Sequence, residues 1–297
     1  MALVYPMEMG IVGSLSLAIP HEDIFKILLD KGARFRPRRG EGIRTPVWIE
    51  VIRAGKAAQL QMLFSKGLDF NEPTFFPEPF GALNFLYSST EAILNTFLQE
   101  GYNPQPGTNY DEHDLKWAAS KGNIALVRLL ISRGLDFSRI SNSQVPNILS
   151  FAAAADDHAA ASEIVDLLLA NGLDIEATDS HGQTALLRVI NNELGYTESA
   201  GVRILLERGA NPCGQTTRGD RRMCPLVALA QRSECPKVET ARLLLQAIDD
   251  QNIPYETVEP QLLRAIDFAQ RYEKKPVPGV LGVLRRWYWR KQYPVKE

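Results

Sequence analysis

The stretch "LLDKGARF", residues 28–35, is the first of six near-copies of one phrase. The others are "LFSKGLDF" (63–70), "FLQEGYNP" (97–104), "LISRGLDF" (130–137), "LLANGLDI" (168–175) and "LLERGANP" (205–212). Their glycines follow one another at spacings of 35, 34, 33, 38 and 37 residues. A fixed period of about 20–50 residues is the sequence signature of a repeat array. The chain is therefore predicted to stack similar units, each of which packs mainly against its neighbours.

Each phrase predicts the end of a helix. Apolar residues precede the glycine in adjacent pairs one turn apart, as in Ile164, Val165, Leu168 and Leu169, which makes a broad apolar stripe on one helix face. The glycine suits a helix terminus at positive φ, which costs a residue without Cβ almost nothing. A shorter helix is predicted before this one, with small alanines in "DLKWAASKGN" (114–123) and "ILSFAAAA" (148–155), and Thr184 is predicted as an N-cap.

These features resemble ankyrin repeats. The matching stretches are "TPVWIEVIRAGKAAQLQMLFSKGLDF" (45–70), "DLKWAASKGNIALVRLLISRGLDF" (114–137) and "DIEATDSHGQTALL" (174–187). The resemblance implies an all-α, ankyrin-type helical-repeat solenoid of about seven to eight helix pairs. Residues 1–297 would form a single solenoid, with an N-terminal cap and first repeat in 1–44, repeats in 45–250 and a C-terminal helical cap in 251–297.

The chain departs from the family pattern in two respects. The histidine usual in the first helix is absent, and Leu187 or Lys116 stands in its place. A seventh unit, "PLVALAQRSECPKVETARLLLQAI" (225–248), ends without the glycine.

Composition indicates a soluble globular protein of a reducing compartment. The net charge of −2 and the absence of a long apolar run disfavour nucleic-acid binding and membrane insertion. The three cysteines, Cys213, Cys224 and Cys235, are odd in number and form no C-x-x-C pair, which favours free thiols. A cytoplasmic or nuclear location is expected.

No catalytic, cofactor or metal motif stands out in the sequence. The four histidines are scattered among different repeats, and His181 is best interpreted as part of a turn. We therefore expect no catalytic residues, no cofactor and no metal site.

Two neighbouring loops are the best candidates for partner binding in the sequence. The basic loop "RFRPRRGEGIR" (34–44) carries Arg36, Arg38, Arg39 and Arg44, whose guanidinium groups could bind carboxylates or phosphates in a bidentate manner. The aromatic loop "NEPTFFPEPFGALNF" (71–85) adds Phe75, Phe76 and Phe80. A solvated basic loop, and phenylalanines tucked under their own loop, are the structural alternatives. Tyr110 and Lys116 complete the predicted site.

The sequence favours a non-enzymatic interaction module. The family resemblance implies that first helices and loop tips line a concave face that contacts a protein or peptide, and the arginines favour an acidic or phosphorylated one. The alternative is an enzyme or small-ligand binder, in which the long loops at 69–80 and 102–113 would enclose an anion-binding pocket.

Overall fold

The structure is a computed structural model of the chain. The structure describes residues 11–35, 46–69, 89–101, 111–135, 137, 140, 144–191, 198–215, 223–230, 238–272 and 279–293. All the regular secondary-structure elements in these ranges are helices, which confirms the all-helical prediction for them. Contacts divide the chain into two compact units, of which the first comprises residues 1–106 and 125–134 and the second comprises residues 107–124 and 135–297.

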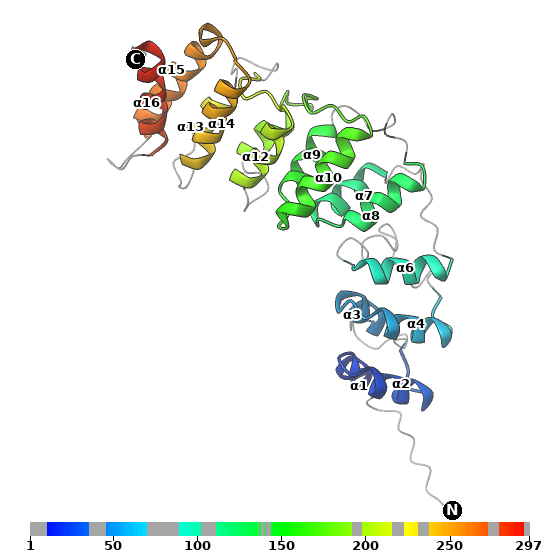
Figure 1. The fold of residues 1–297 in the computed structure, drawn as a ribbon. Helices are drawn as coiled ribbons and strands as arrows, with labels where there is room; N and C mark the ends of the chain where they lie inside the picture. The colour runs from blue at the N-terminus through cyan, green and yellow to red at the C-terminus, as the bar shows by residue number, and fades with distance from the viewer. Residues whose placement is uncertain are drawn as a thin grey trace, which may run out of the picture. The chain divides into compact units, whose positions relative to one another are not determined.

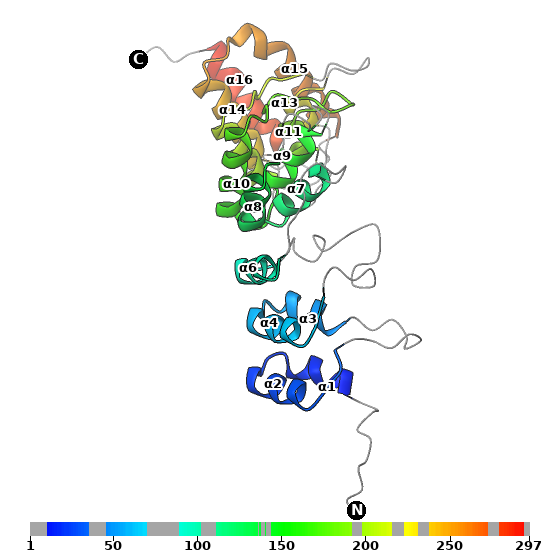
Figure 2. The ribbon, with the colours of Figure 1, turned by 90° about the vertical axis from the view of Figure 1, so that its right-hand side faces the viewer.

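The second unit consists of two rows of helices. The first helices of successive repeats form one row, in which each helix packs on the next in the order α7, α9, α11, α13, α15. The second helices form the other row, in which α10, α12, α14 and α16 pack in the same manner. Figure 1 labels most of these helices, and Figure 2 shows α10, α14 and α16 on one side and α7, α9, α11, α13 and α15 on the other. The helices are α7 (Asp111–Ser120), α9 (Val145–Ala153), α10 (His158–Ala170), α11 (Ala185–Ile190), α12 (Glu198–Glu207), α13 (Pro225–Ala230), α14 (Val238–Asp250), α15 (Tyr255–Tyr272) and α16 (Val280–Gln292).

The first unit repeats this arrangement on a smaller scale. Helix α1 packs on α2 and α3, and α4 packs on α2, α3 and α6 (Figure 1). Trp48 is buried in α3, and the rings of Phe64 and Phe97 meet edge-to-face with centroids 5.4 Å apart. The helices are α1 (Ile11–Ala18), α2 (Glu22–Asp30), α3 (Val47–Arg53), α4 (Ala57–Ser65), α6 (Glu91–Gln99) and α8 (Ile124–Ser132).

The predicted glycine turns end the second helices. All six glycines have positive φ, between 83° and 95°. After α10, for example, the Gly172 N–H donates to the Leu169 carbonyl and the Leu173 N–H donates to the Leu168 carbonyl. This pair of hydrogen bonds is a Schellman motif, and it turns the next apolar residue, Leu173, into the core.

The seventh unit uses the same turn without glycine. Asn252 follows α14 with φ 51°, and its N–H donates to the Asp249 carbonyl while the Ile253 N–H donates to the Ile248 carbonyl. Asparagine adopts the left-handed conformation more readily than other residues with a Cβ. The missing glycine that the sequence indicates is therefore a substitution within the motif.

Small residues permit close approach between the two rows. Ala152 and Ala153 of α9 are fully buried, as the alanine pattern predicts. On α12, a Cβ at Gly201 would lie 2.8 Å from the Ala153 carbonyl oxygen. Real Cβ atoms do not approach an oxygen so closely, so α12 can pack on α9 at this separation only with glycine at position 201.

The last helix pair continues both rows. Helix α15 packs on α13, and α16 packs on α14 and α15. Within "RRWYWRKQY" (285–293), Trp287 is buried, whereas Trp289 is 55% exposed. Trp289 instead stacks on Tyr293 one turn later, with ring centroids 5.3 Å apart.

Candidate functional site

The structure describes one of the predicted site residues. The residues Arg36, Arg38, Arg39, Arg44, Phe75, Phe76, Phe80 and Tyr110 lie outside the described ranges. Lys116 is described, on the first helix of a repeat in the second unit. The site is therefore built outward from Lys116.

Lys116 lies over two aromatic rings. Its Nζ is 5.4 Å from the ring centroid of Trp117 on the same helix and 5.3 Å from that of Phe151 on α9. The two rings are themselves 6.3 Å apart. Cation–π attraction holds the ammonium group at this point, and all three side chains are half-buried. A partner could therefore contact both a fixed positive charge and aromatic surface here.

A column of side chains runs across three first helices. Aligning "LKWAA" (115–119), "LSFAA" (149–153) and "LLRVI" (186–190) places Trp117, Phe151 and Arg188 at the same position of successive repeats. All three are half-buried, whereas the residue that directly follows each of them in the sequence is buried. Because α7 packs on α9 and α9 on α11, these side chains follow one another along the first-helix row. Sequence reasoning missed Phe151 and Arg188, although this alignment of short motifs could have revealed them.

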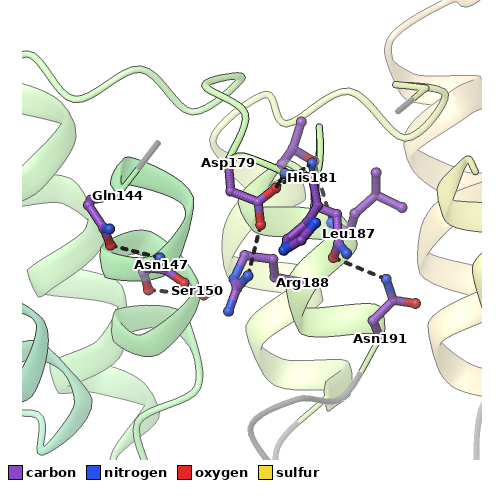
Figure 3. Close-up of polar contacts among 10 residues, drawn as sticks. Gln144, Asn147, Ser150, Asp179, His181, Leu187, Arg188 and Asn191 are labelled. Carbon is purple, nitrogen blue, oxygen red and sulfur yellow. Dashed lines mark hydrogen bonds and ion pairs between the residues drawn. The ribbon is translucent and has the colours of Figure 1, made fainter. Parts of the chain in front are cut away.

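Arg188 is held in place by the loop that precedes its helix. Its Nη1 donates to Oδ2 of Asp179 at 2.9 Å, and Figure 3 shows the side chain extending from α11 toward α9. Asp179 is buried, and its Oδ1 accepts hydrogen bonds from the N–H groups of His181 (2.8 Å) and Gln183 (2.9 Å). His181 therefore occupies a turn, as predicted. Thr184 caps α11 by accepting a hydrogen bond from the Leu187 N–H at 3.4 Å, which confirms the predicted N-cap.

The environment of Asp179 favours its charged form. Burial alone would raise the pKa of this carboxyl group. The two backbone N–H donors and the Arg188 guanidinium outweigh burial, so the pKa lies below its ordinary value. The carboxylate is therefore ionised at neutral pH and fixes the Arg188 side chain.

Two asparagine amides adjoin the column. The Asn147 Nδ2 donates to Gln144 Oε1 at 2.8 Å, and the Asn191 Nδ2 donates to Gln183 Oε1 at 3.2 Å (Figure 3). Both asparagines are half-buried, and within the described ranges neither Oδ1 accepts a hydrogen bond. An amide with a free acceptor and a second N–H can pair with the backbone of a bound segment. We call the following residues the first-helix face: Lys116, Trp117, Asn147, Phe151, Arg188 and Asn191.

The cysteines are not poised for chemistry. Cys213 and Cys224 are buried free thiols, whereas Cys235 lies outside the described ranges. Burial, and to a smaller extent the neighbouring Cys224, raises the pKa of Cys213 to about 12, so this thiol stays protonated at neutral pH.

In the part of the chain that the structure describes, no three side chains of His, Cys, Asp or Glu gather where they could bind a metal ion. None of the described helices has the length and apolar character needed to cross a bilayer.

Comparison with known proteins identifies the repeats. The family model for ankyrin repeats, which spans three copies, matches residues 115–216. This range contains all six residues of the first-helix face and its supporting loop. No curated protein matches the chain.

Several solved structures of ankyrin repeat domains are similar to the chain at low identity. The domain of Bcl-3, described as a unique member of the IkappaB protein family, is 18% identical with a TM-score of 0.45, over 79% of this chain and 97% of that one. The domain of human ASB11 is 20% identical with a TM-score of 0.40, over 92% and 96%. A domain from Acinetobacter baumannii is 20% identical with a TM-score of 0.35, over 79% and 97%.

The family match agrees with the geometry of the described residues. It covers helix pairs that end in positive-φ turns and a loop, residues 174–184, that leads into a capped first helix. Ankyrin repeats generally act as protein–protein interaction modules. The chain contains ankyrin repeats, which the family model places at residues 115–216.

Proposed function

We propose that the chain is a non-enzymatic protein-binding module and that its first-helix face binds an extended segment of a partner protein. The observation that supports this most strongly is the column of Trp117, Phe151 and Arg188, which are half-exposed at the same position of three repeats. Tryptophan and arginine are enriched among the residues that dominate binding energy at protein interfaces. The face lies on the row of first helices, the side that the family resemblance implies to be concave.

The chemistry of the face indicates what the segment carries. Arg188 is neutralised by Asp179, whereas the Lys116 ammonium lies over aromatic rings. A carboxylate or phosphate on the segment would pair with Lys116, and an apolar side chain beside it would cover Phe151. The amides of Asn147 and Asn191 would pair with the segment's backbone.

Affinity capture from native extract with quantitative mass spectrometry tests the proposal. The face variant is Lys116→Ala with Asn147→Ala, because neither side chain supports a turn or a helix cap. The control is Arg203→Ala with Glu239→Ala, which removes an exposed ion pair at 3.4 Å between the second helices α12 and α14. Proteins captured by the wild type and by the control, but lost with the face variant, would support the proposal. A capture profile that the face variant leaves unchanged would contradict it.

The basic and aromatic loops are proposed as a second contact region for the same partner. Arg36, Arg38 and Arg39 would bind an acidic or phosphorylated group, and Phe75 and Phe76 would cover an apolar one. Replacing the three arginines by alanine is expected to weaken partner binding by about tenfold or more, with little change in melting temperature. If this variant binds the partner normally, the basic loop is not part of the site.

The same loops carry the alternative of an enclosed ligand pocket. Nearly all of residues 69–80 and 102–113 fall outside the described ranges, and no observation on the described residues favours that alternative.

A further inference from the structure

A groove lies between two second helices near the C-terminus, away from the first-helix face. It has a volume of about 670 Å³ and is lined by side chains of α14 and α16. Its base is apolar, since Leu245, Val283 and Trp287 are each less than 8% exposed. Its polar lining consists of Arg242, Gln246, Asp249, Arg286 and Arg290. Three arginines thus face a single carboxylate in a chain whose net charge is −2.

The charge of Asp249 is already neutralised within the protein. Its Oδ2 accepts hydrogen bonds from the Trp287 Nε1–H at 3.1 Å and from Arg290 at 2.8 Å, and its Oδ1 pairs with Lys291 Nζ at 2.7 Å. Burial acts to raise the pKa of Asp249, but Lys291, Trp287 and Arg290 outweigh it and lower the pKa below its ordinary value. This cluster fixes the Trp287 ring and joins α16 to α14. Arg290 and Lys291 are therefore structural cations.

Arg242 and Arg286 are the cations that remain for a ligand. Arg242 makes a long, exposed contact of 3.7 Å with Glu239, which also pairs with Arg203. Arg286 is exposed and, within the described ranges, has no carboxylate at ion-pair distance. The two guanidinium groups come from different helices and line the same groove. Guanidinium groups bind carboxylates with two parallel hydrogen bonds, which gives both affinity and orientation.

The geometry points to this groove as a second docking site, whose occupant is a carboxylate-rich segment of a protein. Charge complementarity with Arg242 and Arg286 selects the occupant, and Gln246, which also lines the groove, adds a neutral donor and acceptor. From Arg242 to Asp249 the groove follows α14 for about 10 Å, which spans three residues of an extended chain. The segment would approach the row of second helices, so it can bind while the first-helix face is occupied.

Fluorescence anisotropy of a labelled oligoglutamate peptide with the full chain tests the assignment. Wild-type protein is expected to bind the peptide, and binding should weaken as salt is added. Arg242→Gln with Arg286→Gln should weaken binding by about tenfold or more, since each charged hydrogen bond contributes about 1.5–3 kcal/mol. The melting temperature should not change, because neither side chain supports the fold.

Arg285→Gln is the matched control for Arg286→Gln. Arg285 is the adjacent residue of α16, equally charged and exposed, but it does not line the groove. Oligoglutamate binding that Arg286→Gln weakens and Arg285→Gln leaves within about twofold would support the site. Equal effects of the two variants would indicate diffuse attraction and overturn it. The assignment also fails if oligoglutamate does not bind, or if single-stranded oligothymidylate binds more tightly through the same arginines, since the occupant would then be a nucleic acid.

Discussion

Left-handed turns end seven second helices, at Gly32, Gly67, Gly101, Gly134, Gly172, Gly209 and Asn252. A Cβ at Gly134 would meet nothing within 4 Å, so a substitution there tests backbone conformation without steric clash. Gly134→Val is expected to reduce the free energy of unfolding by about 1–3 kcal/mol, because a β-branched residue is forced to positive φ. Gly134→Asn should cost less, since asparagine already performs this role at position 252. Denaturant melts that give equal costs for Val and Asn would contradict the turn assignment.

Asp179 makes stability depend on pH. Its pKa in the folded state is below the ordinary value of 3.8, so the folded protein holds this proton less tightly than the unfolded chain does. The resulting stabilisation is complete above the unfolded pKa, near 4, and is lost as pH falls through the folded pKa. Asp179→Asn is expected to reduce the free energy of unfolding by about 2 kcal/mol at neutral pH. The difference from wild type should narrow below about pH 4. A difference that stays constant from neutral pH to pH 3 would show that the charge of Asp179 is not what stabilises the loop.

At the scale of elements, Arg208 joins neighbouring repeats. Its guanidinium donates to both carboxylate oxygens of Asp166 at 2.7 Å, and its Nη2 also donates to the Ser162 carbonyl and hydroxyl on α10. Arg203, on the preceding helix α12, forms an exposed pair with Glu239. Arg208→Ala is expected to cost about 2 kcal/mol of unfolding free energy, and Arg203→Ala less than about 1 kcal/mol. Equal costs in chemical denaturation would mean that the bidentate contact does not hold the repeats together.

The sequence predicted helices well and their contacts with one another less well. The repeated phrase predicted the second helices and their turns because glycine and paired apolar residues act locally. Asn252 was not predicted as a turn residue because the repeated phrase is recognised by its glycine. Asparagine can also adopt the left-handed conformation that this glycine indicates. The need for glycine at position 201 was also missed, because it arises from the Ala153 carbonyl on another helix, and such a contact has no local signature.

The candidate site shows the same limit. Lys116 was one of the predicted site residues, and the structure places its ammonium group over Phe151, which the sequence had not indicated. Arg188 could not be recognised from its own position, because its side chain is oriented by the carboxylate of Asp179, nine residues earlier. The predictions that rest on the basic and aromatic loops stay predictions, because those residues lie outside the described ranges.

For the whole molecule, the terminal helix pair is expected to act as a cap. Helices α15 and α16 cover α13 and α14, whose Leu229, Leu244 and Ile248 are at most 1% exposed. Deleting residues 255–297 would expose this apolar surface, so the truncated chain is expected to aggregate or to unfold with lower cooperativity. Light scattering and thermal melting measure both effects. A truncated chain that stays monomeric and melts like the full chain would show that the pair is not a cap.

The most direct test of the account is site-specific photo-crosslinking in native extract. A photoreactive amino acid is placed at Asn147 or Asn191 on the first-helix face, and at Ala170 or Arg203 on the second helices as controls. The account predicts that one and the same protein is crosslinked from both face positions and from neither control position. A partner crosslinked from Ala170 or Arg203, with none from Asn147 or Asn191, would contradict the claim that the first-helix face is the binding surface.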